Sequence, residues 1–370
     1  MSELRHAALL IWRSPVYAAA AVLTIALGIG ANTAVFTVVR SVLLEPLPFR
    51  DPGALVQVWE THPELHNLQV SYPDYLDWKS SLKSADLGAY TFEAIDKGTL
   101  LGQGDPLKVQ ATNASFQLFP ILGITPMLGR AYNAQEEEGK AQVVLISERL
   151  WRQKFSADKG IIGQSLRLDA NSFTILGVVP QSQAFPSWAD VWIPLSLTEQ
   201  DLKATRKYHP LEVIGRLGPG VSIEQSQIEI DTVSRGLSVV YPATNSKIGA
   251  LVLPLKEAIT GEVRPALVAV WIAAGLVLVI ACANVGLLMA TRSFNRRRDI
   301  AVRLALGATR KASVREFFIE TAILSIIGGI CGLVLARAGL PVLVKMSQGR
   351  IPRLEAVELD GHALIFGLCA

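Results

Sequence analysis

The sequence predicts a membrane α-helical protein with three complete spans, a partial fourth span and a large external α+β domain. This fold class rests on three apolar runs, one basic loop and one long segment of mixed polarity. Residues 16–39 and 266–290 contain no formal charge, and residues 319–336 contain one acidic side chain, Glu320. Each run is long enough to cross a hydrocarbon core of about 30 Å as a helix of roughly 20 residues.

The basic loop lies between the second and third apolar runs. Residues 291–316 contain eight arginine or lysine residues and only two acidic residues, and Arg5 and Arg13 precede the first run. Positive charges close to span ends mark the cytoplasmic side of a membrane. The N-terminal segment and the basic loop are therefore expected in the cytoplasm, and residues 45–264 outside it.

The first apolar run is expected to remain as an anchor, because it is longer than the 7–15 apolar residues of a cleaved signal peptide. Residues 1–15 before it have apolar side chains at helical spacing and predict a short amphipathic helix. At the other end, residues 362–370 begin a further apolar run that is too short to span a bilayer. These residues are interpreted as the start of a truncated fourth span.

The external segment alternates between strand-like and helix-like patterns. Ser71 precedes a helix that reaches Trp78, Ser147 precedes another helix, and Ser222 with Gln225 forms a capping box for a helix to about Val240. The predicted strands cover residues 55–60, 142–146, 211–217 and 250–255, and residues 165–179 predict a hairpin. This order indicates an α+β domain with sheets covered on one side.

Together these observations divide the chain into eight segments. They are a cytoplasmic amphipathic helix (1–15), the first span (16–44), the external domain (45–264), the second span (265–290), the cytoplasmic loop (291–316), the third span (317–340), a short external segment (341–361) and the start of the truncated span (362–370).

The basic loop itself predicts a short amphipathic helix. Ile300, Leu304 and Ala308 recur every four residues, and Gly307 can end the helix. Such a loop can simply hold the topology or bind anionic lipid. A stripe of small apolar residues bordered by arginines also suits docking into a groove of another protein.

Two long motifs give the loop and the first span a resemblance to a known family. Residues 296–329, "RRRDIAVRLALGATRKASVREFFIETAILSIIGG", and residues 14–56, from "SPVYAAAAVLTIALGIG" to "DPGALV", resemble FtsX/MacB-type ABC transporter permeases. The external segment resembles the MacB-like periplasmic core domain through "SYPDYLDW", "LGITPMLGR", "VVLISERLWRQKF", "IIGQSLRLDANSFTILGVVP" and "ADVWIP". The resemblance extends to the duplicated permeases of acidobacteria, of which this chain corresponds to one half, truncated in its fourth span.

The resemblance implies a multi-pass protein of the bacterial inner membrane, with the large domain in the periplasm. It also implies that the loop carries a coupling helix, which docks on an ABC ATPase subunit and passes its motion to the periplasmic domain for export. The residues implied for this contact are Arg297, Arg298, Asp299, Ile300, Arg303, Ala305, Gly307 and Ala308. Further expected partners are a second permease copy or half, a periplasmic adaptor or outer-membrane protein, and membrane lipids, but no nucleic acid.

Intrinsic ATP hydrolysis is not expected. MacB carries an ATPase domain fused before its first span, whereas here few residues precede that span, and the sequence contains no GxxxxGK[ST] motif. No catalytic residue, directly bound cofactor or metal site is predicted, and ATP is expected to be used by the partner. Two alternatives remain open, namely an FtsX-like regulator that activates a periplasmic hydrolase, and a non-functional permease fragment.

Small and polar residues within the spans predict helix packing. Gly328 and Gly332 form a small-xxx-small pair in the third span, a pattern that lets two helix backbones approach closely. Gly28 and Gly30 favour close helix contact in the first span, and Asn32 and Asn284 can form hydrogen bonds across helices.

Overall fold

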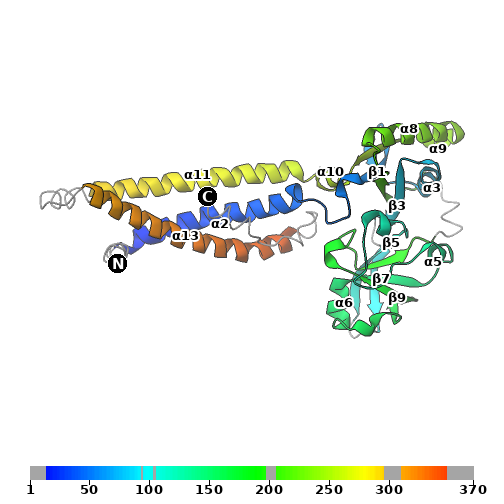
Figure 1. The fold of residues 1–370 in the computed structure, drawn as a ribbon, viewed down its shortest axis with the longest axis horizontal. Coiled ribbons are helices and arrows are strands. Elements are labelled where there is room, and N and C mark those ends of the chain that lie inside the picture. Colours follow the sequence, from blue (N-terminus) through cyan, green and yellow to red (C-terminus); the bar gives the residue numbers. More distant parts are fainter. Residues whose placement is uncertain (1–13, 93–94, 103–105, 197–205, 296–309, 348–370) are drawn as a thin grey trace. The chain divides into compact units, whose positions relative to one another are not determined.

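A computed structural model of the chain describes residues 14–92, 95–102, 106–196, 206–295 and 310–347. The chain divides into two compact units (Figure 1). The first, which we call the helical unit, consists of Met1–Glu45 with Gly261–Ala370, and the second, the sheet unit, is Pro46–Thr260. The eight coupling residues of the basic loop, residues 1–13 of the predicted amphipathic helix (1–15) and the predicted start of a truncated fourth span (362–370) lie outside the described residues.

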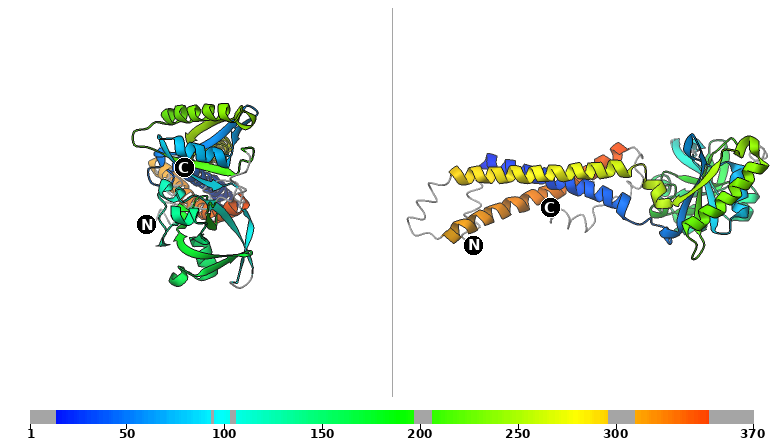
Figure 2. Two further views of the ribbon diagram at one scale, coloured as in Figure 1. Left: turned by 90° about the vertical axis from the view of Figure 1, so that its right-hand side faces the viewer. Right: turned by 90° about the horizontal axis from the view of Figure 1, so that it is seen from above.

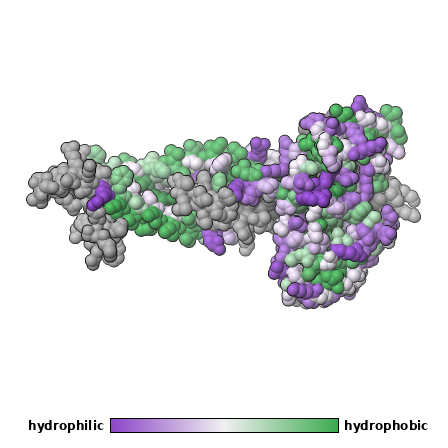
Figure 3. Space-filling model, viewed as in Figure 1, coloured by the Kyte–Doolittle hydropathy of each residue, from purple (hydrophilic) through white to green (hydrophobic). Residues whose placement is uncertain are grey.

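The described part of the helical unit contains three long helices. They are α2 (Pro15–Val39), which continues as a π-helical turn over Arg40–Leu44, α11 (Arg264–Asn295) and α13 (Arg310–Ser347). Three segments are long and apolar enough to cross a membrane, namely Pro15–Leu44, Arg264–Arg292 and Phe318–Val342. Apolar side chains cover much of the visible surface of these helices (Figure 3). Helix α13 continues past Pro341, which costs one backbone hydrogen bond but does not end the helix.

Helix α2 packs against both other helices (Figure 2). In its most apolar window 56% of the residues are buried, compared with 17% for the window in α11 and 22% for that in α13. Helix α13 contains a row of buried residues spaced four apart, Glu320, Leu324, Gly328, Gly332, Ala336 and Leu340. Such a row forms one ridge along a helix, so a single face of α13 makes the contact.

Twelve strands in the described part of the sheet unit form one sheet. They are β1 (Leu55–His62), β2 (Leu65–Leu68), β3 (Ala85–Thr91), β4 (Ile95–Leu101), β5 (Leu107–Ala114), β6 (Leu128–Gly129), β7 (Val143–Ser147), β8 (Ser165–Leu168), β9 (Asn171–Val179), β10 (Val191–Pro194), β11 (Leu211–Leu217) and β12 (Gly249–Pro254). The strand order is β10-β7-β9-β8-β4-β5-β3-β11-β1-β12, with β2 paired to β1 and β6 to β9.

One additional pairing divides this sheet into two parts. Strand β10 pairs with β5 in parallel, in the register Val191↔Ala111 to Pro194↔Ala114, as well as with β7. The strands β10, β7, β9, β8, β4 and β5 therefore close into a ring of pairings, whereas β3, β11, β1 and β12 continue as an open sheet. The ends of the sheet unit meet in this open sheet, because β1 and β12 are antiparallel neighbours with Val56 opposite Pro254.

The described part of the sheet unit contains seven α-helices, and three of them begin at predicted caps. The seven helices are α3 (Tyr72–Ser81), α4 (Leu118–Leu122), α5 (Ala134–Glu138), α6 (Glu148–Phe155), α8 (Ile223–Val240), α9 (Pro242–Asn245) and α10 (Leu255–Thr260). Ser71 accepts a hydrogen bond from the Asp74 N–H, Ser147 accepts one from the Leu150 N–H, and Ser222 forms a capping box with Gln225. These three caps and the predicted hairpin, now β8 and β9, are confirmed.

The prediction that the sheet is covered on one side is wrong. In the open sheet, Val56 of β1 packs in a cluster with Trp78 of α3 and Ile230 of α8. The preceding residue, Leu55, packs in another cluster with Leu118 of α4 and Leu255 of α10. Successive side chains of a strand point to opposite faces, so helices cover both faces of this part of the sheet. The short helices α4 and α10 carry too few residues to show a helical repeat in the sequence.

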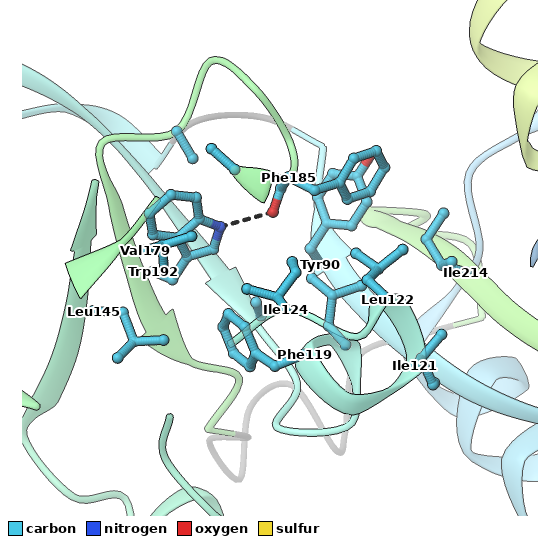
Figure 4. Packing of buried hydrophobic residues seen from close by; sticks show 14 of the residues in the cluster. Tyr90, Phe119, Ile121, Leu122, Ile124, Leu145, Val179, Phe185, Trp192 and Ile214 are labelled. Atoms are coloured by element: carbon cyan, nitrogen blue, oxygen red, sulfur yellow. Dashed lines mark hydrogen bonds between the residues drawn. The ribbon is translucent and has the colours of Figure 1, made fainter. Parts of the chain in front are cut away.

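The second of these clusters continues into the ring of strands (Figure 4). There, Trp192 of β10 is fully buried near Phe119 and Leu145, and its indole N–H donates to the Phe185 carbonyl at 2.8 Å. On β7 the neighbours Val144 and Ile146 pack instead with α6 in a third cluster. The buried Trp192 thus fills the core without leaving its polar atom unpaired.

Candidate functional site

The coupling residues implied by the resemblance, 297–308, lie outside the described residues, but both helices that border them are described. Helix α11 ends at Asn295 and helix α13 begins at Arg310. The loop is therefore joined covalently to the described residues at these two helix ends. Both helices contact α2.

Glycines on α2 allow close approach from both sides. A Cβ atom built on Gly28 would lie 3.1 Å from Cβ of Ala281 on α11, and one built on Gly30 would lie 2.9 Å from the carbonyl oxygen of Gly332 on α13. Two residues correspond to about 200° around an α-helix. The sequence Gly-Ile-Gly thus lets α11 and α13 pack against opposite faces of α2.

Gly328 and Gly332 both lie at the contact between α13 and α2. A Cβ atom on Gly332 would meet the Ala26 carbonyl oxygen at 2.9 Å, and one on Gly328 would meet Cγ2 of Ile25 at 2.7 Å. Real Cβ atoms essentially never come this close, and at Gly332 the obstructing atom belongs to the backbone. A larger residue there would require the two helices to separate.

A polar side chain joins α2 to α11. The buried amide of Asn32 donates from Nδ2 to the Ala274 carbonyl at 2.7 Å and to the Gly28 carbonyl at 3.0 Å. Hydrogen bonds between membrane helices satisfy groups that lipid cannot. Asn284, for which the sequence suggested the same role, has an exposed side chain on α11.

The sheet unit contains a buried polar cluster that sequence reasoning missed. The fully buried carboxylate of Glu60 on β1 accepts a hydrogen bond from the Ser71 N–H at 2.8 Å and lies 2.8 Å from Nδ1 of His209. The equally buried Asp74 of α3 accepts from the Asn245 amide at 2.9 Å. Each carboxylate thus has partners that offset the cost of its burial.

Arg206 completes the cluster. Its guanidinium forms ion pairs with Asp74 and Asp77, the latter at 2.6 Å, and lies 3.8 Å from the centre of the Tyr241 ring. These contacts bind the chain just before β11 to α3 and to the end of α8. No local sequence pattern reveals this cluster, because Arg206 and Asn245 each bond to an aspartate more than 100 positions away in the chain.

Two pKa shifts make this cluster sensitive to pH. Burial raises the pKa of Glu60 to about 7, although the contact with His209 opposes the shift, and the hydrogen bond to Glu60 raises the pKa of His209. A raised carboxyl pKa means that the folded state loses stability as pH rises from the unfolded value of 4.5 toward 7. The raised pKa of His209 acts in the same direction, because its stabilisation is complete below pH 6.5 and is lost as pH rises through the folded value.

The sheet unit is therefore expected to lose about 2 kcal/mol of stability between pH 5 and pH 8. Urea unfolding of residues 46–260, followed by tryptophan fluorescence at each pH, measures this loss. Glu60→Gln removes the titrating carboxyl and should reduce this loss, although burial also raises the pKa of Glu212 and so keeps part of it. A parent whose stability is constant or increases over this range would contradict the assignment.

Comparison with known proteins places these features in a family. The family model described as "MacB-like periplasmic core domain" matches residues 18–233, which include most of α2 and most of the sheet unit. The model described as "FtsX-like permease C-terminal" matches residues 271–356, which include most of α11, the basic loop and α13.

Curated relatives and solved structures give weaker matches. The macrolide export ATP-binding/permease protein MacB of Salmonella typhi is 24% identical over 250 residues, 66% of this chain and 37% of the relative. The protein of the same name from Neisseria gonorrhoeae is 23% identical over 266 residues, 71% of this chain and 40% of the relative. The chain thus spans about two fifths of the length of these relatives.

Two solved structures are similar to part of the chain, with TM-scores below 0.5. The periplasmic region of MacB from Actinobacillus actinomycetemcomitans gives a TM-score of 0.43 at 12% identity and covers 60% of this chain and 97% of its own. A domain of a putative permease from Porphyromonas gingivalis gives 0.45 at 19% identity and covers 56% and 93%. The family is established by the sequence models instead: since the first of them matches more than half of the chain, the chain belongs to the MacB/FtsX family of ABC transporter permeases.

Proposed function

We propose that the chain is the permease subunit, or one half of the permease, of an ABC transporter whose ATP is hydrolysed by a separate ATPase subunit. One observation carries this proposal. The FtsX-like match includes α13 and most of α11, the two helices that border the basic loop, and the MacB-like match includes most of α2 and most of the sheet unit. The loop is then the ATPase contact, and the sheet unit is the part that acts on substrate in the periplasm.

The connectivity supports a mechanical role for the helices. The chain passes from the π-helical end of α2 into β1 and returns from β12 through α10 to α11. Because β1 and β12 are paired neighbours, both covalent connections reach the sheet unit at the same part of the open sheet. A displacement of α2 relative to α11 would therefore load one pair of strands rather than two distant points.

The proposed function also implies where the protein is located and which partners it has. The protein is a multi-pass component of the bacterial inner membrane that works with an ABC ATPase and with a second permease copy or the other half of a duplicated permease. The relatives named above are macrolide export proteins that combine an ATP-binding part and a permease part. For this chain we propose extrusion of a drug, peptide or lipoprotein from the periplasmic side. ATP is bound by the partner and not by this chain.

The proposed ATPase contact is tested by Ala305→Asp. This substitution places a charge beside the apolar stripe of the predicted coupling helix, and an unpaired charge buried in an interface costs several kcal/mol. The variant is expected to insert and express normally in the native host but to lose the cognate ATPase during affinity purification. Thr309→Asp adds the same charge beyond Gly307, outside the apolar stripe, and should retain the ATPase.

Co-purification of the ATPase with Ala305→Asp at the parent level would reduce the loop to a determinant of topology. Failure of both the parent and Thr309→Asp to retain any ATPase would contradict the proposed function as a whole.

A further inference from the structure

An ion pair and an aromatic ring join the three helices of the helical unit at the end that borders the basic loop. Arg292 in the last turns of α11 pairs with Glu320 of α13, and the side chains are only 14% and 6% exposed. The Arg292 guanidinium lies 4.2 Å from the centre of the Tyr17 ring on α2. The three residues come from the first or last turns of the three candidate spans.

A gain in stability alone does not explain an ion pair whose two side chains are this well buried. Replacing a buried ion pair by apolar side chains of similar size is often neutral or stabilising, whereas removing one partner leaves a costly unpaired charge. The rest of the α13 contact row consists of small or apolar residues, beginning with Leu324 and Gly328. The ion pair therefore adds a directional, orientation-dependent link at one end of an otherwise apolar contact.

The position of the ion pair in the chain suits it to transmit movement of the basic loop. The backbone from Arg292 to Glu320 includes the whole predicted coupling helix, and the ion pair closes this segment at its base. Without the pair, the ends of α11 and α13 could bend separately when the loop is pushed. With it, and with the Tyr17 contact, a push on the loop must displace all three helices together.

We propose that Tyr17, Arg292 and Glu320 form a loop-base clamp, a set of positioning residues that delivers movement of the basic loop to α2, α11 and α13 as one body. This inference rests on the proposed function for the source of the movement. The clamp itself is a property of the helical unit and can be measured without the ATPase.

The first experiment measures the clamp in the full chain in lipid nanodiscs. Cys282, Cys331 and Cys369 are replaced by alanine, and spin labels are attached at Leu287→Cys on α11 and Phe318→Cys on α13, two exposed positions near the clamp. The parent should give one narrow distance distribution. Glu320→Gln should at least double its width, and the exchange of Arg292→Glu with Glu320→Arg should restore it.

A control pair of labels and a third variant test whether the broadening is specific to the clamp. Labels at Val268→Cys and Val342→Cys lie at the opposite ends of the same helices and should not respond to Glu320→Gln. Tyr17→Leu keeps the ion pair but removes the ring, so it should broaden the distance from an α2 label at Leu23→Cys to Leu287→Cys. If Glu320→Gln cannot be purified, recovery of a folded, narrow charge-exchanged protein supports the clamp. An unchanged distance distribution in Glu320→Gln overturns the clamp. If Glu320→Gln and the charge-exchanged protein both fail to fold, an unchanged distribution in Tyr17→Leu overturns it instead.

The second experiment tests whether the clamp transmits movement from the ATPase to the opposite ends of α11 and α13. In the complex with the ATPase, addition of ATP should shift the distance between Val268→Cys and Val342→Cys in the parent. Glu320→Gln should retain the ATPase and its ATP turnover but lose this shift. An unchanged shift in Glu320→Gln would overturn the coupling role. A parent that binds no ATPase but keeps a narrow, Glu320-dependent distance at the clamp would instead refute the proposed function and leave the clamp intact.

Discussion

Replacing Gly332 with leucine is expected to destabilise the helical unit by roughly 3 kcal/mol, the upper range for inserting extra carbons into a packed contact. Even a single Cβ atom at this position would lie 2.9 Å from a backbone carbonyl oxygen of α2 and 3.2 Å from the Gly30 nitrogen. Because backbone atoms cannot rotate away like side chains, α13 would have to move off α2. The close contact between small residues, which drives association of membrane helices, would then be lost.

The matched control for this change is Gly339→Leu on the same helix, where a Cβ atom would meet nothing within 4 Å. Unfolding of both variants by SDS in mixed micelles, followed by helicity, gives the two free energies. The control should stay within about 0.5 kcal/mol of the parent, as surface substitutions usually do. Equal losses for the two variants would show that the Gly30–Gly332 contact does not hold the helices together.

Asp74→Ala is expected to destabilise the sheet unit by about 3 kcal/mol or more, because it breaks a buried ion pair from one side. Asp74 is 1% exposed, and its removal leaves the Asn245 amide and one side of the Arg206 guanidinium without their carboxylate partner. Urea unfolding of residues 46–260 at pH 6 measures the loss. The segment before β11 would then be paired with α3 only through the partly exposed Asp77.

Asp77→Ala provides the comparison, since Asp77 pairs with the same Arg206 from a side chain that is 37% exposed. Partly exposed ion pairs contribute about 0–1 kcal/mol, so this variant should lose less than about 1 kcal/mol. A loss at Asp74 no larger than that at Asp77 would mean that the cluster is not the attachment point inferred from its geometry.

The features that the sequence alone predicts are those that depend on residues close together in the chain. Ser71, Ser147 and Ser222 were identified as helix caps because the capping residue and the helix it starts are adjacent in the chain. The apolar runs of the three candidate spans were found for the same reason, since length and composition decide whether a helix can cross a membrane.

The features that sequence could not predict depend on contacts between distant residues. The parallel pairing of β10 with β5 has no local signal, and neither does the meeting of Glu60 with His209. Glu320 was visible as a lone charge in an apolar run, but its partner Arg292 belongs to a different helix. The sequence identified Gly30 and Gly332 separately as packing glycines, whereas the structure shows that these two residues lie opposite each other.

The central claim, that the basic loop is the contact with an ATPase, is tested most directly by photo-crosslinking from Ala305 in the native host. A photoreactive amino acid at this position should form an adduct with a protein that contains a GxxxxGK[ST] motif, identified by mass spectrometry. The same amino acid at Phe318, exposed on the apolar surface of α13, should give no such adduct. Adducts from Ala305 with lipid alone would contradict the account and leave the loop as a determinant of topology.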